Sequence, residues 1–264
     1  MKTTKKLLYF LMVLTLPLFV VSCEKDDSKP NLEEFEPGEI PGLGDTDGEL
    51  TGAAFTLPNG ITLIEDITGA GDSDYYWIDL YGSPSRTFTA KDGTQITKSF
   101  AETVSYEDQH YFGSGRGYVD LLIPLQNNNS SSTTITFPAG LIIRSVSGNS
   151  QNGILIKKVT ITIPANSSYY LCLSFYCGNA HKSSAHSSDV YVWGVISNAS
   201  ILMELCEKVK NKKINLEEFS PSSINDYTTY SEQTYRLQSI VWRITDYDGM
   251  TEDDIAYINS LPNS

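Results

Sequence analysis

The chain has 264 residues, a formal net charge of −13 at pH 7, and 40% hydrophobic and 19% charged residues. This composition is typical of a folded core and unlike that of a disordered chain. The acidic balance would repel nucleic-acid phosphates, so we exclude nucleic acid as a partner. The length allows one large domain or two small ones.

The first 22 residues have the layout of a secretory signal peptide. Residues 1–6 include three lysines, and residues 7–21 are apolar apart from Thr15 and Pro17. This apolar core is shorter than the roughly 20 residues that a membrane-spanning helix needs. We therefore expect residues 1–22 to be removed on export.

The apolar core ends on Val20, Val21, Ser22 and Cys23, and this end resembles a lipobox, in which the cysteine is acylated and becomes the mature N-terminus. Residues 24–27 (Glu-Lys-Asp-Asp) resemble the export tag of surface lipoproteins of Bacteroidetes-type bacteria. These resemblances imply an outer-membrane lipoprotein, attached to the membrane by acyl chains such as palmitate on Cys23 and exposed at the cell surface. Each buried methylene contributes about 0.8 kcal/mol, so two or three chains form a lasting anchor. The alternative is an ordinary signal peptide with a cysteine nearby.

Residues 23–50 contain ten acidic residues and two lysines among prolines and glycines. Proline stiffens such a segment and like charges extend it. We expect residues 23–50 to be an acidic linker between the lipid and the folded domain.

Residues 51–178 contain short runs of β-branched and aromatic residues separated by polar turns, which is typical of strands. We expect strands at 61–64, 75–81, 86–89, 118–125, 133–137, 140–143, 158–163 and 169–177. The Asp92-Gly93 pair predicts a hairpin after the third of these. The regular spacing favours an antiparallel β-sandwich.

Residues 179–264 change to a helical pattern. Residues 198–211 carry an apolar stripe, and Thr229 with Glu232 resembles a capping box that opens a helix ending before Gly249. Thr251 is expected to cap a last short helix. We therefore predict a mainly β fold with α, in which a helical C-terminal portion packs on the β domain.

Two short motifs carry the candidate chemistry. Tyr176-Cys177-Gly178 lies at the end of a predicted strand, and residues 238–242, Gln-Ser-Ile-Val-Trp, lie in a predicted helix. Together they resemble the paired motifs of bacterial thioester-domain adhesins, over residues 170–248. The chain departs from that family because it lacks the alanine after Gln238, and because the family is usually attached to a cell wall.

The resemblance implies an internal thioester between the Cys177 sulfur and the Gln238 carbonyl carbon, which would react with an amine of a ligand. Helical spacing places Trp242 one turn from Gln238, where it could shield the bond. His181 or His186 could assist proton transfer, because imidazole titrates near neutral pH. The protein would then be an adhesin or ligand-capture protein for a host or cell-surface protein or glycan, and not an enzyme.

The cysteine count leaves a different outcome open. With Cys23 assigned to lipid, Cys172, Cys177 and Cys206 remain, which is an odd number. Cys172 and Cys177 differ in parity along one strand, so they should face opposite sides. A Cys177–Cys206 disulfide is the alternative, and it would exclude the thioester.

Other functions are weighed against capture by a thioester. Tyr75, Tyr76 and Trp77 could serve a non-covalent glycan- or peptide-binding module, and a structural surface protein needs no ligand chemistry. A cysteine hydrolase is disfavoured because no orienting third residue is recognisable. Asp246 and Asp248 with the acids at 252–254 lack the spacing of a calcium-binding EF-hand, and the three histidines have no zinc-site spacing. We expect no metal and no cofactor.

Overall fold

The computed structural model describes residues 31–70, 85–89, 95–99, 110–115, 118–219 and 224–264. Within it, Leu32–Ser264 form one compact unit. Strand (34%) outweighs helix (22%), so the expected mainly β class with C-terminal helices is confirmed. The predicted signal peptide, Cys23 and the aromatic run at 75–77 lie outside the described residues.

The described strands are short apart from three. They are β1 (Gly52–Ala54), β2 (Ile61–Leu63), β3 (Ile67–Gly69), β4 (Ser85–Thr89), β5 (Gln95–Ser99), β6 (His110–Gly113), β7 (Val119–Asn127), β8 (Thr133–Phe137), β9 (Leu141–Ser145), β10 (Gly153–Leu155), β11 (Val159–Ile163), β12 (Ser168–Cys177) and β13 (Val190–Ser197). The described helices are α3 (Ser200–Val209), the 3-10 helix η2 (Leu216–Glu218), α4 (Ile224–Thr245) and α5 (Glu252–Ser260).

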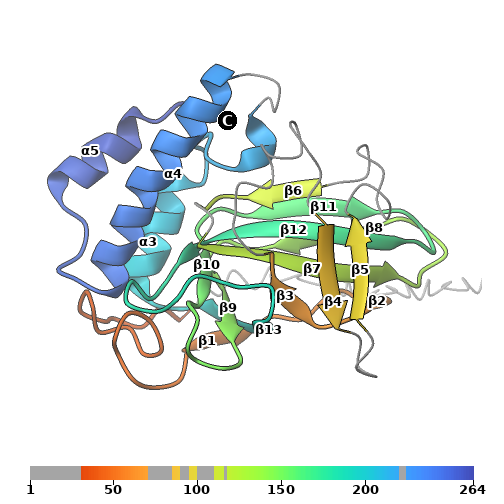
Figure 1. Ribbon diagram of the computed structural model, residues 1–264. Helices are drawn as coiled ribbons and strands as arrows, with labels where there is room; N and C mark the ends of the chain where they lie inside the picture. The colour runs from red at the N-terminus through yellow and green to blue at the C-terminus, as the bar shows by residue number, and fades with distance from the viewer. Residues whose placement is uncertain (1–30, 71–84, 90–94, 100–109, 116–117, 220–223) are drawn as a thin grey trace, which may run out of the picture. The chain divides into compact units, whose positions relative to one another are not determined.

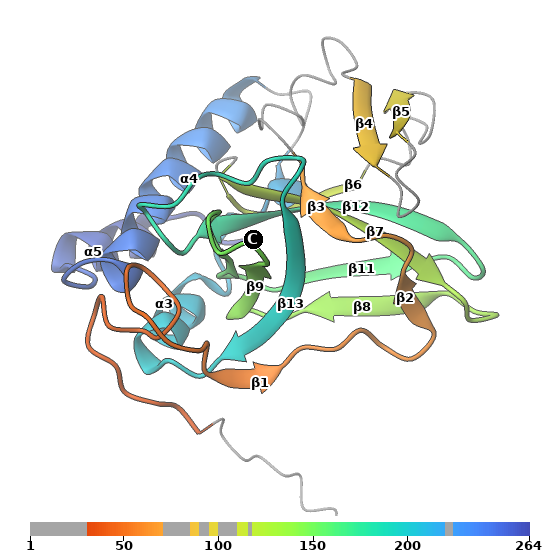
Figure 2. The same ribbon diagram turned by 60° about the horizontal axis from the view of Figure 1, so that its bottom comes forward.

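Six of the described strands close into an antiparallel barrel in the order β7–β3–β13–β9–β10–β12, because β12 pairs back onto β7 (Figures 1 and 2). The closing register runs from Ser168 opposite Gln126 to Phe175 opposite Val119. The predicted β-sandwich is therefore wrong. Alternating burial along a strand is the same in a sandwich and a barrel, whereas closure depends on pairings between distant strands, here β3 with β13.

The first hydrophobic core takes alternate residues from the barrel strands. From β12 it contains Leu171, Leu173, Phe175 and Cys177. Side chains two apart along a strand share a face, so this set defines the inner face of β12. Cys177 is therefore the last inward residue of the strand.

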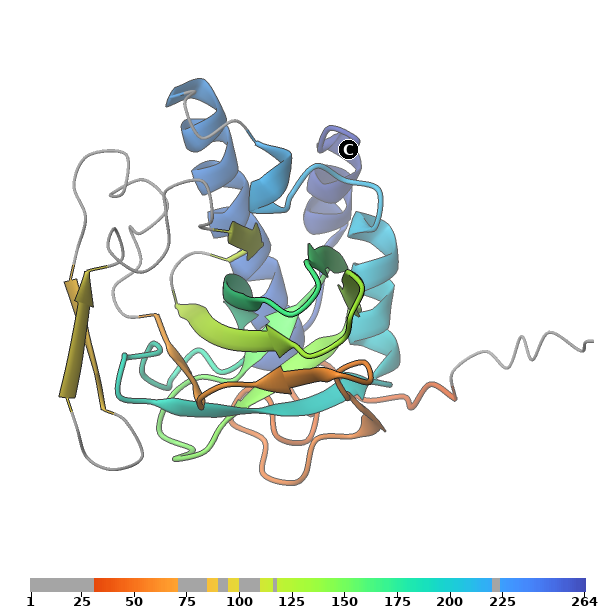
Figure 3. The ribbon, with the colours of Figure 1, turned by 90° about the vertical axis from the view of Figure 1, so that its right-hand side faces the viewer.

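The second hydrophobic core lies between the barrel and helices α3, α4 and α5, which lie together on one side of the strands (Figures 1 and 3). The helices contribute apolar residues at helical spacing, such as Leu237, Ile240 and Ile244 of α4. Tyr176 of β12 belongs to this core, whereas its neighbour Cys177 belongs to the first. The end of β12 thus joins the two cores.

The predicted helical portion, residues 179–264, also contains β13, which is needed to close the barrel. Gly194 interrupts the strand pattern there, and a Cβ on it would lie 2.6 Å from the carbonyl oxygen of Ile142. Helix α4 begins at Ile224, so the predicted start at Thr229 is wrong. Helix α5 begins after Thr251, whose side chain accepts the amide of Asp254, as predicted.

The folded unit begins at Leu32, well before the predicted boundary at residue 51. Ile40 and Leu43 are fully buried in the second core. The amide of Gly44 donates to the carbonyl of Gly178 at 2.7 Å. Residues 32–50 therefore belong to the domain, and residues 23–30 of the predicted linker lie outside the described residues.

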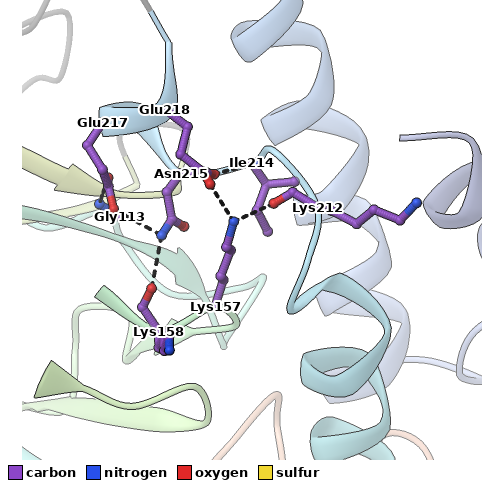
Figure 4. A network of polar contacts seen from close by, with 8 residues as sticks. All are labelled: Gly113, Lys157, Lys158, Lys212, Ile214, Asn215, Glu217 and Glu218. Atoms are coloured by element: carbon purple, nitrogen blue, oxygen red, sulfur yellow. Dashed lines mark hydrogen bonds and ion pairs between the residues drawn. The ribbon is translucent and has the colours of Figure 1, made fainter. Parts of the chain in front are cut away.

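An ion pair between buried Lys157 and partly buried Glu218 links η2 to the segment between β10 and β11 (Figure 4). The Lys157 ammonium lies 2.6 Å from Oε1 of Glu218 and donates to the carbonyl of Lys212. The other carboxylate oxygen of Glu218 accepts the amides of Ile214 and Asn215 at 2.9 and 2.8 Å. Each charge thus has several partners, as a buried charge needs.

Candidate functional site

Cys177 ends β12 in a fully buried position, opposite Gly153 of β10. The next residue, Gly178, is held by two backbone hydrogen bonds: its amide donates to the carbonyl of Asn152, and its carbonyl accepts the amide of Gly44. A Cβ on Gly178 would lie 3.0 Å from side-chain atoms of Leu43 and Ile154, so only glycine fits comfortably. The strand therefore ends in a closely packed turn.

Gln238 of α4 reaches the end of β12 with its side chain almost completely buried. Its Oε1 accepts the backbone amide of Cys177 at 2.8 Å, and its Nε2 donates to the Cys177 carbonyl at 2.9 Å. A buried carboxamide needs such partners for both ends. The two bonds fix the Gln238 carboxamide against the residue that carries the thiol.

Trp242 lies one helical turn after Gln238 and contacts the sulfur directly. Its indole Nε1 donates to Cys177 Sγ at 3.2 Å, and the backbone amide of Asn179 donates to the same sulfur at 3.4 Å. The Trp242 ring is partly exposed and lies 5.4 Å from that of Tyr118. The indole thus separates the sulfur from solvent on its side.

Burial raises the pKa of the Cys177 thiol to about 12, although the hydrogen bonds from Trp242 and Asn179 counteract part of that rise. Burial disfavours the charged thiolate, whereas donors aimed at sulfur stabilise it. Near neutral pH the thiol is therefore protonated.

The two histidines expected to assist proton transfer lie elsewhere. His181 is exposed, with its Nε2 3.7 Å from Oδ2 of Asp45. His186 is exposed and donates its backbone amide to Asp189. Among the described residues, no hydrogen bond joins either imidazole to the Cys177 sulfur. The structure brings Cys177, Gln238 and Trp242 together and leaves both histidines outside.

The structure also bears on the alternative disulfide and on the acidic stretch considered for calcium. Cys177 and Cys206 are both buried and belong to no disulfide, so the alternative disulfide between them is not formed. In the acidic stretch, Asp254 is fully buried, pairs with Arg236 and Arg243, and caps α5. A structural task thus accounts for that carboxylate.

Residues 32–50, here called the N-terminal segment, form a wall of the site that the sequence patterns did not reveal. The side chain of Asn179 donates to the carbonyl of Gly44 and accepts the amide of Asn152, whose own side chain donates to the carbonyl of Gly42. A cavity of about 380 Å³ lies beside this wall, lined in part by Asp45 and Lys182. Ile40 and Leu43, apolar residues within an acidic run, were the available sign that this segment is folded.

No protein-family model, curated protein or solved structure matches this chain. Among the helices that the structure describes, none has the length and apolar character that a membrane crossing needs.

Proposed function

We propose that this protein is a surface lipoprotein that captures amine-bearing ligands through an internal thioester between Cys177 and Gln238. The observation that carries the proposal is the pair of hydrogen bonds that hold the Gln238 carboxamide on the backbone of Cys177. Two groups held in fixed proximity react far faster than the same groups free in solution.

Formation of the bond is a balanced exchange. The Cys177 sulfur attacks the Gln238 carbonyl carbon, the carbon–nitrogen bond breaks, and the thiol proton leaves with the nitrogen as ammonia. The amide of Cys177 already donates to Oε1, where negative charge develops in the tetrahedral intermediate. A fixed donor at that oxygen lowers the barrier, as in an oxyanion hole.

Capture reverses the roles of sulfur and nitrogen. A ligand amine attacks the thioester carbonyl carbon, the carbon–sulfur bond breaks, and a proton moves from the amine to sulfur. The product is an amide between Gln238 and the ligand, with Cys177 again a thiol. The donors from Trp242 and Asn179 point at the sulfur that acquires charge in this step.

The burial of the site supports a thioester that stays intact until a ligand reaches it. Cys177 and Gln238 are almost completely buried, which keeps water from hydrolysing the bond before a ligand arrives. Each molecule would react once, so the protein is a capture protein or adhesin and not an enzyme. Acylation of Cys23 would hold it at the outer membrane, facing a host or cell-surface protein or glycan that carries an amine.

Intact mass spectrometry tests the proposal. Incubation with methylamine should add about 31 Da to the wild-type protein, because the amine opens the thioester and stays attached. Since each preparation is compared with itself, lipidation does not affect the difference. Cys177→Ala and Gln238→Ala should take up nothing, whereas Cys206→Ala, which removes a different buried thiol, should react like the wild type. Absence of uptake by folded wild-type protein, or uptake by folded Cys177→Ala, would refute the proposal.

A further inference from the structure

Three potential metal ligands from distant parts of the chain converge beside the loop that follows β12. They are Asp45 of the N-terminal segment, His181 of the loop and Asp246, which directly follows α4. One ligand atom of each lies within 4.8 Å of the others, and His181 Nε2 lies 3.7 Å from Asp45 Oδ2. Sequence spacing could not reveal this group, since each segment contributes one ligand.

One of the three ligands is already oriented. Asp246 is half-buried, its Oδ1 accepts the amide of Ala180 at 2.9 Å, and its Oδ2 accepts the Thr245 hydroxyl at 2.6 Å. Hydrogen bonds to a ligating carboxylate fix its direction and are typical of metal sites. Asp45 and His181 are exposed, so their side chains can turn toward a common centre.

The charge at this point also favours a cation. The carboxylates of Asp45 and Asp246 belong to the same group, with one ligand atom of each within 4.8 Å of the other. Two like charges at such a distance repel each other. A divalent cation between them would remove that repulsion.

We propose that Asp45, His181 and Asp246 form a site for a divalent transition-metal ion of the zinc type. One imidazole with two carboxylates is a donor set that zinc accepts, and three protein ligands leave a fourth position for water. The bound ion would fasten the N-terminal segment to the loop and to the end of α4. These residues take no part in the thioester chemistry, so the two proposals stand or fall separately.

Calorimetric titration with zinc chloride tests the site, on full-length protein purified without a histidine tag and treated with a chelator. We expect one equivalent to bind and the melting temperature to rise, because an ion that binds only the folded state stabilises it. His181→Ala and Asp45→Asn should each weaken binding at least tenfold. His186→Ala and Asp47→Asn are the matched controls, since they remove an imidazole and a carboxylate outside the group.

Two results would overturn the assignment. One is the absence of stoichiometric binding by the wild-type protein. The other is His181→Ala protein that binds zinc as tightly as the wild type, because the imidazole would then not be a ligand. The ligand residues are exposed or half-buried, so circular dichroism of each variant will establish that it is folded before titration.

Discussion

The carboxamide of Gln238 is hydrogen-bonded to both backbone polar groups of Cys177, a residue 61 positions earlier in the chain. In a β-sheet, a neighbouring strand would satisfy such groups. Here the pairing of β12 with β7 ends at Phe175, whereas Cys177 still lies opposite Gly153 of β10. On the side that β7 leaves open, a helix side chain takes the place of a strand. The same contact serves the fold, by satisfying a buried strand end, and the proposed chemistry, by fixing a carbonyl beside a thiol.

The contribution of these two hydrogen bonds to the free energy of unfolding can be measured separately from the thioester. In Cys177→Ala protein the backbone groups remain and no cross-link can form. Adding Gln238→Ala should then lower the free energy of unfolding by about 2–4 kcal/mol, because a buried amide and a buried carbonyl lose their partners. Urea denaturation measures the change.

Ser239→Ala in the same background is the matched control. Ser239 is the next residue of α4, and its hydroxyl only donates to the Tyr235 carbonyl one turn earlier. We expect it to cost well under 1 kcal/mol, as substitutions outside buried networks do. Equal costs for the two variants would contradict the importance of the Gln238 bonds.

Alkaline pH should distinguish a free thiol from a thioester. Burial raises the pKa of Cys206 from 9.0 to about 12, so the folded state retains a proton that the unfolded state loses. The stability from this proton is complete below pH 9 and is lost as the pH rises toward 12, at most about 1.4 kcal/mol per unit. Cys206→Ala should therefore flatten the fall in unfolding free energy above pH 9.

Cys177 has a similarly raised pKa as a thiol, but a thioester sulfur carries no proton. If the bond forms, Cys177→Ala will leave the slope between pH 9 and pH 10.5 unchanged. After methylamine treatment of the wild type, the regenerated thiol should steepen that slope. Denaturant titrations at several pH values measure both effects. A slope that Cys177→Ala flattens without prior methylamine would show that the thiol is free.

The ion pair of buried Lys157 with partly buried Glu218 predicts a large cost for removal of the carboxylate (Figure 4). In Glu218→Gln protein the Lys157 ammonium loses its counter-charge in a site where it is only 6% exposed. Breaking a buried pair on one side costs about 3–5 kcal/mol. Chemical denaturation will measure it, with Glu207→Gln as control.

Glu207 pairs with Lys210 on the exposed face of the chain, and exposed pairs contribute at most about 1 kcal/mol. The double variant Lys157→Met with Glu218→Gln should recover part of the loss, because no unpaired charge remains. A cost for Glu218→Gln no greater than that for Glu207→Gln would argue that water reaches Lys157.

Local pattern in the sequence predicted several elements well. The alternation in β11 and the long apolar run of β12 are strong strand patterns, and Thr251 with Asp254 marks the start of α5. These features depend on neighbours within a few residues. The closure of the barrel does not depend on such neighbours. It requires β3, which has three residues, and β13, which has an internal glycine. Each is weak as a local pattern, and pairing stabilises both.

The residues of the candidate site also divide into those that the sequence predicted and those that it did not. Cys177, Gln238 and Trp242 were identified through a resemblance to short motifs, and the structure places them in contact. The contribution of residues 42–45 was missed because their acidic, glycine-rich composition is typical of a linker. His181 was expected to assist proton transfer at Cys177 because imidazole titrates near neutral pH. Beyond the end of β12, however, the loop turns its imidazole toward Asp45 and solvent.

Trp242 should affect the rate of thioester opening through its indole hydrogen bond to sulfur. Trp242→Phe keeps an aromatic ring over the site and removes the donor. Negative charge develops on sulfur as the carbon–sulfur bond breaks, and a hydrogen bond to a charged group contributes about 1.5–3 kcal/mol. We therefore expect methylamine to open the thioester at least tenfold more slowly in this variant, as followed by mass against time. The final uptake measures how much thioester was present, so rate and occupancy are obtained separately.

Tyr118→Phe, which keeps the ring beside Trp242 and loses only a hydroxyl, should react at the wild-type rate. If Trp242→Phe also opens at that rate, the indole serves only as a cover, and Asn179 is the donor that stabilises the leaving sulfur.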